Sequence, residues 1–159
     1  MSKKIQFLVI HCTATPEGRA VTADDIRRWH LSAPPAGRGW KQVGYTDMIL
    51  FNGVVERLAT NNEDDTVDAW EVTNGAAGIN SVSRHIVYVG GTDKSLKAKD
   101  TRTPEQEAAL KSYVLDFVRR FPDVKVAGHY QFAAKACPSF DVPAWCREIG
   151  VPEKNINGT

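Results

Sequence analysis

The segment "IQFLVIHC", from Ile5 to Cys12, decides the fold of this chain. Its apolar residues fall on both alternating faces, a pattern typical of a strand in the middle of a sheet that is covered on each side. The segment therefore predicts a central buried strand with His11 near its carboxyl end. Because Cys12 follows His11 directly, its side chain points to the opposite face, and we interpret it as a core residue.

Signals for three helices follow this strand along the chain. Thr22 with Asp25, and Thr103 with Gln106, are spaced as capping boxes, so each pair predicts the start of a helix. A proline directly after Thr103 strengthens the second prediction. A third, short helix is predicted near the carboxyl end. The predicted helices span residues 23–32, 104–121 and 142–150.

Further strands are predicted from β-forming runs. The segment 45–58 carries such residues on either side of Asn52-Gly53, which is the strongest short hairpin signal, so Tyr45 should open an antiparallel pair. The other predicted strands are "RHIVYVGG" at 84–91 and "VKVAGH" at 124–129. Strands and helices that alternate around a hairpin predict an α/β fold, a single domain with a central mixed β-sheet flanked by helices.

Length, charge and cysteine count limit the function. The 159 residues suit one domain, and 20 Lys and Arg against 19 Asp and Glu leave a net charge of +1, which gives no electrostatic basis for a nucleic-acid partner. No apolar run approaches the ~20 residues of a membrane span. The run Ile5–Ile10 is too short for a signal peptide, so we expect synthesis in the cytoplasm. Three cysteines indicate a metal, a reactive thiol or burial rather than a disulfide framework.

Two polar segments are expected at the surface. Residues 59–80 are acidic and polar and predict a long surface excursion. Residues 151–159 form a polar carboxyl-terminal tail, which we expect to be frayed.

The segment "GHYQFAAKACPSFD", residues 128–141, holds the candidate chemistry. Together with His11, its residues His129 and Cys137 could supply three ligands of a catalytic zinc ion, which leaves the fourth position for water. From spacing alone this indication is weak, because His-x7-Cys is not a standard zinc motif and a buried histidine in the core explains the pattern as well. By the same reasoning Tyr45 is a β-forming residue and Lys135 a surface charge.

The remaining histidines and Cys146 have no partner at ligand spacing. His30 lies in a predicted helix, His85 begins a predicted strand, and Cys146 lies beside a tryptophan in the closing helix. We interpret all three as packing residues.

Six segments in a fixed order resemble the zinc-dependent N-acetylmuramoyl-L-alanine amidases of the type 2 family, which includes bacteriophage T7 lysozyme and the peptidoglycan recognition proteins. Together they extend over nearly the whole chain, and this shared order is more specific than any single segment. The segments are "VIHCTAT" (9–15), "DIRRWH" (25–30), "GWKQVGY" (39–45), "INSVSRHIVYVGG" (79–91), "TRTPEQEAAL" (101–110) and "GHYQFAAKACPSFD" (128–141).

The resemblance implies a function and a site. Residues 1–150 would form an amidase catalytic domain that binds Zn2+ through His11, His129 and Cys137, with Tyr45 and Lys135 in catalysis. Its partner would be bacterial peptidoglycan, in which it would hydrolyse the amide bond between N-acetylmuramic acid and L-alanine. An endolysin-like monomer would reach the cell wall after release or indirect export.

The sequence also departs from the family pattern. Tyr130 and Gln131 stand where many members have an Arg-Asp pair, and Ala77 falls near a position where many have a histidine. In another branch a catalytic glutamate lies in the strand that here contains Val87. The alternative is a non-catalytic peptidoglycan-binding module on the same fold, but such binders lack the ligand matched by Cys137. A structural zinc site would need a fourth protein ligand.

Overall fold

The computed structural model describes residues 2–158 and is built on one five-stranded sheet with the order β5-β4-β7-β2-β9. Strands β4, β7, β2 and β9 run parallel, and β5 joins the edge antiparallel to β4. The sheet is therefore mixed, as predicted. Its strands are β2 (Phe7–Cys12), β4 (Asp47–Ile49), β5 (Val55–Arg57), β7 (Ser83–Tyr88) and β9 (Lys125–Gly128).

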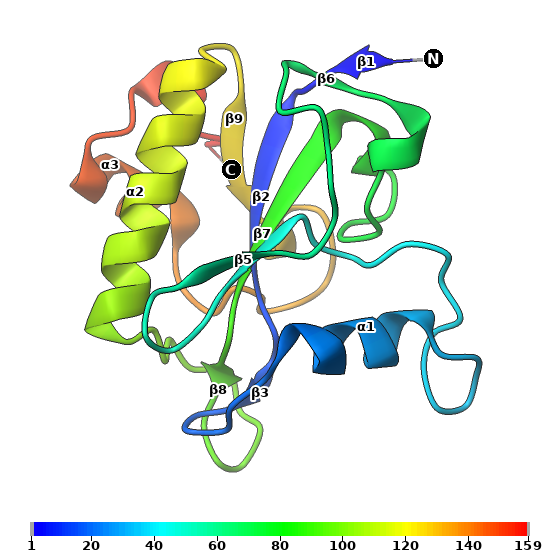
Figure 1. Cartoon of the computed structure of the whole chain (residues 1–159). Coiled ribbons are helices and arrows are strands. Elements are labelled where there is room, and N and C mark those ends of the chain that lie inside the picture. The colour runs from blue at the N-terminus through cyan, green and yellow to red at the C-terminus, as the bar shows by residue number, and fades with distance from the viewer. Residues whose placement is uncertain (1, 159) are drawn as a thin grey trace.

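Two short strand pairs lie outside the main sheet. In one, β1 (Lys3–Lys4) pairs with β6 (Thr66–Val67) in antiparallel fashion. In the other, β3 (Thr15–Pro16) and β8 (Gly91–Thr92) are parallel. The second pair continues the direction of β2 and β7 beyond the main sheet (Figure 1).

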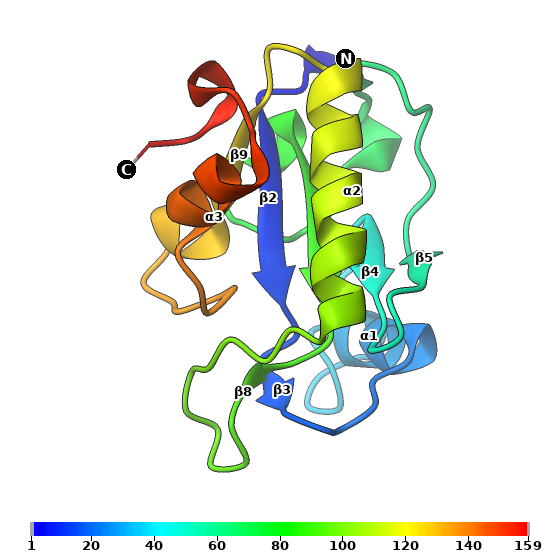
Figure 2. The ribbon, with the colours of Figure 1, turned by 90° about the vertical axis from the view of Figure 1, so that its left-hand side faces the viewer.

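Three α-helices pack around the sheet. Helices α2 (Pro104–Arg120) and α3 (Val142–Ile149) cover one face, and α1 (Ala23–Leu31) lies on the other side (Figures 1 and 2). Among residues 2–158, no helix has the length and apolar character to cross a bilayer.

Strand β2 is buried on both faces, as its sequence predicts. Leu8, Ile10 and Cys12 belong to the apolar core that includes residues of α2 and α3. Val9 and His11 alternate with them and are fully buried. His11 is the register partner of Val87, which belongs to the core cluster that includes Ile26 of α1, so both residues face the side of the sheet on which α1 lies. The alternation places His11 on a different face from the main core, and the site forms there.

Both predicted capping boxes are present. The Thr22 hydroxyl accepts a hydrogen bond from the Asp25 amide at 3.1 Å, and Thr103 accepts one from Gln106 at 3.0 Å. Gln106 also has a role that capping does not predict. Its buried amide nitrogen donates to the carbonyl oxygens of Ile49 and Val89, at 3.2 and 3.0 Å. One side chain thus caps α2 and fixes it to the carboxyl ends of β4 and β7.

The hairpin at Asn52-Gly53 joins β4 and β5 as predicted, and Gly53 has a φ of +86°. That left-handed conformation favours glycine. The position of Tyr45 differs from the prediction, because β4 begins only at Asp47. Tyr45 instead lies in the loop between α1 and β4 and is not part of the sheet.

The carboxyl-terminal tail is packed rather than frayed over residues 151–158, which corrects the prediction there, while Thr159 lies outside the described residues. Val151, Asn155 and Ile156 are buried, and Ile156 forms a β-bridge with Val126 of β9. The Asn155 amide nitrogen donates to the carbonyl oxygens of Pro122 and Val124, at 2.7 and 2.9 Å. The few apolar residues of the tail complete the core beside the edge strand, and a short 3-10 helix, η4 (Glu153–Asn155), aligns them.

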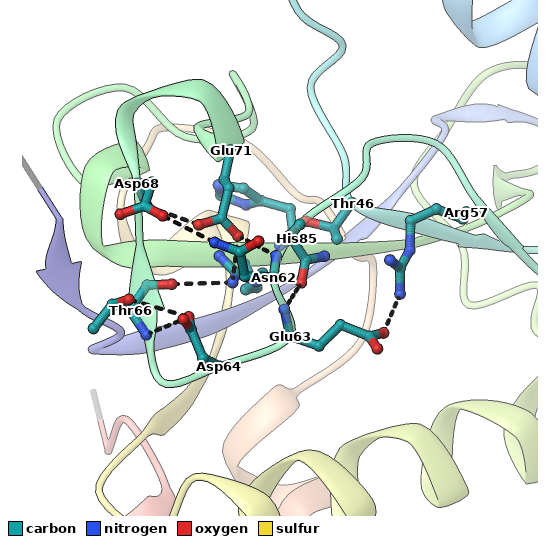
Figure 3. Close-up of polar contacts among 11 residues, drawn as sticks. Thr46, Arg57, Asn62, Glu63, Asp64, Thr66, Asp68, Glu71 and His85 are labelled. Atoms are coloured by element: carbon teal, nitrogen blue, oxygen red, sulfur yellow. Dashed lines mark hydrogen bonds and ion pairs between the residues drawn. The ribbon is translucent and has the colours of Figure 1, made fainter.

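The segment 59–80 is also more deeply anchored than its composition predicts. Glu71, in the 3-10 helix η1 (Ala69–Glu71), forms an ion pair with Arg84 of β7 at 3.0 Å, and their side chains are 0% and 4% exposed. The same carboxylate accepts hydrogen bonds from the backbone amides of Asn62 and Asp68 (Figure 3). The segment is therefore anchored by the buried Glu71 carboxylate and is not a loosely attached surface loop.

This buried ion pair gives a prediction for stability. Glu71→Ala leaves the guanidinium of Arg84 buried without its carboxylate, so the free energy of unfolding should fall by about 3–5 kcal/mol. Urea denaturation followed by circular dichroism measures the change. Asp123→Ala is the matched control, because Asp123 pairs with Lys4 in the open, with side chains 73% and 60% exposed. That variant should lose less than about 1 kcal/mol, and equal losses in the two variants would contradict the assignment.

Candidate functional site

Three potential metal ligands meet at the carboxyl ends of two neighbouring strands. His11 lies near the end of β2, His129 directly follows β9, and Cys137 lies in the loop before α3. Their ligand atoms all lie within 4.8 Å of one another. Among residues 2–158 they form the one group of at least three His, Cys, Asp or Glu side chains close enough to share an ion. The structure thus brings together the three residues that the sequence proposed as ligands.

Backbone contacts hold Cys137 beside His11. The Tyr130 amide donates to the carbonyl oxygen of Cys137 at 2.9 Å, and the Tyr88 hydroxyl donates to the carbonyl oxygen of Pro138 at 2.6 Å. The amide of Cys12 donates to the Cys137 sulfur at 3.1 Å. The loop is therefore fixed from the carboxyl ends of β2, β7 and β9, and the Cys137 sulfur lies 3.8 Å from Nδ1 of His11.

The residues fit a zinc ion in donor type and spacing. Zinc accepts imidazole nitrogen and thiolate sulfur, at distances that place neighbouring tetrahedral donors about 3.5 Å apart. The distance of 3.8 Å between the Cys137 sulfur and His11 Nδ1 agrees with this spacing. Three protein ligands leave one position open, which is typical of catalytic rather than structural sites. No fourth ligand joins them within residues 2–158.

The histidines of the site are neutral at pH 7. Burial lowers the pKa of His11 well below its ordinary value, and burial followed by the nearby charge of Lys135 lowers the pKa of His129. A neutral imidazole keeps the free lone pair that a metal requires. The hydrogen bond to the Cys12 thiol, together with burial, raises the pKa of Cys137 while no cation is bound. The Cys137 thiol must therefore release its proton when a metal binds.

His85 is a contact of the site that the sequence did not reveal. It is fully buried, as a packing residue should be, but its Nδ1 lies 2.8 Å from Nε2 of His11. Its own Nε2 lies 3.0 Å from the side-chain oxygen of Asn80. The register of β2 and β7 pairs Val9 with His85, so His11 and His85 share one face of the sheet. Only this register, and no local spacing, could have identified the pair.

A groove opens beside the ligands. Its volume is about 270 Å³, and its walls include Arg38, Trp40, Tyr45, His129 and Lys135. Burial raises the pKa of Tyr45, so its phenol stays protonated and can donate a hydrogen bond. The groove also holds Ala77, with no imidazole at that position. Both residues expected in catalysis therefore line the same groove as His129, and the ring centre of Tyr45 lies 5.0 Å from that of His11.

The residues that depart from the family pattern have structural contacts. The Tyr130 hydroxyl accepts a hydrogen bond from the Val142 amide at 3.2 Å. Gln131 accepts one from the Gly128 amide at 2.9 Å and donates to the carbonyl oxygen of Asn157 at 2.8 Å. These contacts join the turn after β9 to α3 and to the tail. Val87 is the register partner of His11 and is fully buried, so no carboxylate faces the ligand from that strand.

Among the remaining candidates, Cys12 and Cys146 are packing residues, as interpreted, whereas His30 is buried but also lines the groove. Cys12 and Cys146 are buried in the core that includes residues of α2 and α3. Cys12 contacts Cys137 through both its backbone and its thiol but is not a member of the ligand group. His30 is buried on α1, and its Nδ1 accepts a hydrogen bond from the Gly44 amide at 2.9 Å.

Comparison with known proteins identifies the family of this chain. Residues 1–140 match the N-acetylmuramoyl-L-alanine amidase family (Amidase_2). The chain is 34% identical over 142 residues to an endolysin of Enterobacteria phage K11, covering 89% of this chain and 85% of that protein. It is 32% identical over 138 residues to the endolysin of Escherichia phage T7, covering 87% of this chain and 83% of that protein.

The fold is also that of a solved peptidoglycan recognition protein. Drosophila PGRP-LB superposes with a TM-score of 0.68 at 20% identity, over 100% of this chain and 91% of that one. From its sequence, its fold and its relatives, the chain belongs to the type 2 N-acetylmuramoyl-L-alanine amidase family.

Proposed function

We propose that residues 1–150 form the catalytic domain of an endolysin-like amidase, which cleaves the bond between N-acetylmuramic acid and L-alanine in bacterial peptidoglycan. The observation that carries the proposal is the meeting of His11, His129 and Cys137 beside a groove that Tyr45 and Lys135 also line. Family membership and the phage endolysin relatives support the same reaction.

Catalysis of this reaction must activate the attacking nucleophile and stabilise the carbonyl oxygen. An amide resists water at neutral pH, so the site needs a strong nucleophile and compensation for the negative charge on the carbonyl oxygen. A bound zinc ion would supply an activated water molecule and would polarise the carbonyl group. We propose that His11, His129 and Cys137 hold this ion. Two neutral imidazoles and one thiolate would leave the centre with a net charge of +1.

Tyr45 and Lys135 are proposed to act on the substrate. The protonated phenol of Tyr45 can donate a hydrogen bond to the developing oxyanion, because burial keeps its pKa above the ordinary value. Lys135 is exposed at the edge of the groove, and no ion pair within residues 2–158 includes it. Its ammonium group can therefore approach the reacting carbonyl and offset the charge that forms there.

The proposal extends to assembly and location. We expect a monomer, as the resemblance to the endolysins implies. The enzyme would act on the cell wall after release from the cytoplasm or after indirect export.

Digestion of purified peptidoglycan tests the reaction and the cofactor together. Mass spectrometry should detect free stem peptides that begin with L-alanine, and a zinc chelator should abolish them because the metal activates the water. Added zinc should restore the products. Sedimentation with intact peptidoglycan distinguishes the alternative, because a binding module would sediment with the polymer and release no peptides.

Replacement of the thiolate ligand tests the metal centre. Cys137→Ala should lose both zinc and peptide release, since two neutral histidines alone hold the ion weakly. Inductively coupled plasma mass spectrometry measures the metal content. Cys146→Ala is the matched control, because Cys146 is a buried thiol outside the ligand group, and it should retain zinc. A Cys137→Ala protein with full zinc content and full activity would disprove the ligand assignment.

Replacement of the groove residues tests the catalytic roles. Tyr45→Phe and Lys135→Met should each lower kcat by about 10²–10³, the usual effect of removing one donor to an oxyanion. Their zinc content should stay normal, because neither residue is a ligand. Lys94→Met, at another exposed lysine, should leave kcat unchanged. Normal kcat in either groove variant would exclude that residue from catalysis.

A further inference from the structure

We propose that His85, held by Asn80, is a positioning residue that fixes the ring orientation and the tautomer of His11, so that His11 presents a bare Nδ1 to the metal. The inference rests on the proposed function, because it takes His11 as a metal ligand. It adds two residues, on β7 and on the preceding 3-10 helix η2 (Asn80–Val82), to the machinery of the site.

The chain of hydrogen bonds begins at Asn80. Its Oδ1 accepts a hydrogen bond from the backbone amide of Ala76 at 2.8 Å. A backbone N–H can only donate, so the side-chain atom that faces it must be the oxygen and not the amide nitrogen. The orientation of the Asn80 amide is therefore determined by its surroundings.

The next link is the ring of His85. Its Nε2 lies 3.0 Å from the same Oδ1, which can only accept, so this nitrogen must carry a hydrogen. Its Nδ1 faces Nε2 of His11 at 2.8 Å. In its neutral form the ring carries one hydrogen, so Nδ1 of His85 is the acceptor in this contact.

The last link sets the tautomer of His11. Its Nε2 must donate to His85, so the single hydrogen of the neutral ring lies there and Nδ1 keeps a free lone pair. That Nδ1 is the atom that lies 3.8 Å from the Cys137 sulfur. The opposite tautomer would place a hydrogen between His11 and the metal position. A partner on the second nitrogen is the usual means by which proteins orient a metal-bound histidine.

The surroundings make room for His85. A Cβ atom at Gly75 would lie 2.5 Å from Nδ1 of His85, so only glycine allows the ring its position. The hydroxyl of Thr46 accepts a hydrogen bond from the His85 amide at 3.3 Å, and Figure 3 shows the two residues side by side. The ring is thus held by the strand, by Asn80 and by the space that Gly75 leaves.

Zinc affinity gives the first test, with two variants of one residue. His85→Leu fills the space without an acceptor and should raise the zinc dissociation constant about 10–100-fold, the usual effect of losing such a partner. His85→Asn places an amide oxygen near the former Nδ1 and should restore most of the affinity. Competition with a chromophoric chelator measures both constants. Asn155→Ala is the control, because this buried amide lies at the opposite end of β9 from His129; its affinity should be that of the wild type.

Nuclear magnetic resonance of the metal-free protein gives a second test, which is independent of activity. Long-range ¹H–¹⁵N spectra should show the proton of His11 on Nε2 in the wild type and an exchanging mixture of tautomers in His85→Leu. His30 is an internal reference, because its Nδ1 accepts from the Gly44 amide and its tautomer should not change.

The outcomes separate this inference from the proposed function. A wild-type protein that binds no zinc would overturn the metal centre itself. A folded His85→Leu protein with unchanged zinc affinity and an unchanged His11 tautomer would overturn the positioning role alone. If His85→Leu does not fold, Asn80→Leu at a partly exposed position replaces it. It should weaken zinc binding in the same direction, and unchanged affinity would again count against the proposal.

Discussion

The site depends on the parallel pairing of β2 with β9. Their register aligns Ile10 with Gly128, so the next residue along each segment, His11 in β2 and His129 directly after β9, lies at the same edge of the sheet. The ring centres of the two histidines are 4.6 Å apart. Gly128 permits this ending, because a Cβ atom there would lie 2.6 Å from the Tyr130 ring. A shift of one residue in this register would turn the His11 side chain to the opposite face.

The two faces of the sheet have different roles, because one packs against the main apolar core and the other carries the candidate site. On the face of α2 and α3, the strands contribute to a large apolar core, which also includes apolar residues of the carboxyl-terminal tail. Buried hydrogen bonds of Gln106 and Asn155 attach α2 and the tail to this part of the molecule. On the other face His11, His85 and Val87 are equally buried. Burial there keeps the imidazoles neutral, with the pKa of His85 lowered to about 3. The same exclusion of water that stabilises the fold thus keeps both imidazoles uncharged, so His11 keeps the free lone pair that a metal would require.

Much of the fold could be predicted from the sequence because its signals are local. The capping boxes at Thr22 and Thr103, the turn at Gly53 and the doubly apolar run of β2 each depend on neighbouring residues. The tail and the segment around Glu71 are more buried than the sequence predicts. Their composition is polar, but a few of their side chains pack against or pair with residues far away in the chain. Composition averages over residues, whereas burial depends on which individual side chains find a partner.

The sequence by itself determined the order of the elements and, through its resemblance to a family, predicted His11, His129, Cys137, Tyr45 and Lys135 as candidate site residues. Only the tertiary structure brought the three candidate ligands within reach of one ion and placed Tyr45 in a loop beside them. It alone joined His85 to His11, which lie 74 positions apart in the chain. The physical reason is that a tautomer depends on the partner of each ring nitrogen, and strand pairing decides which partner that is.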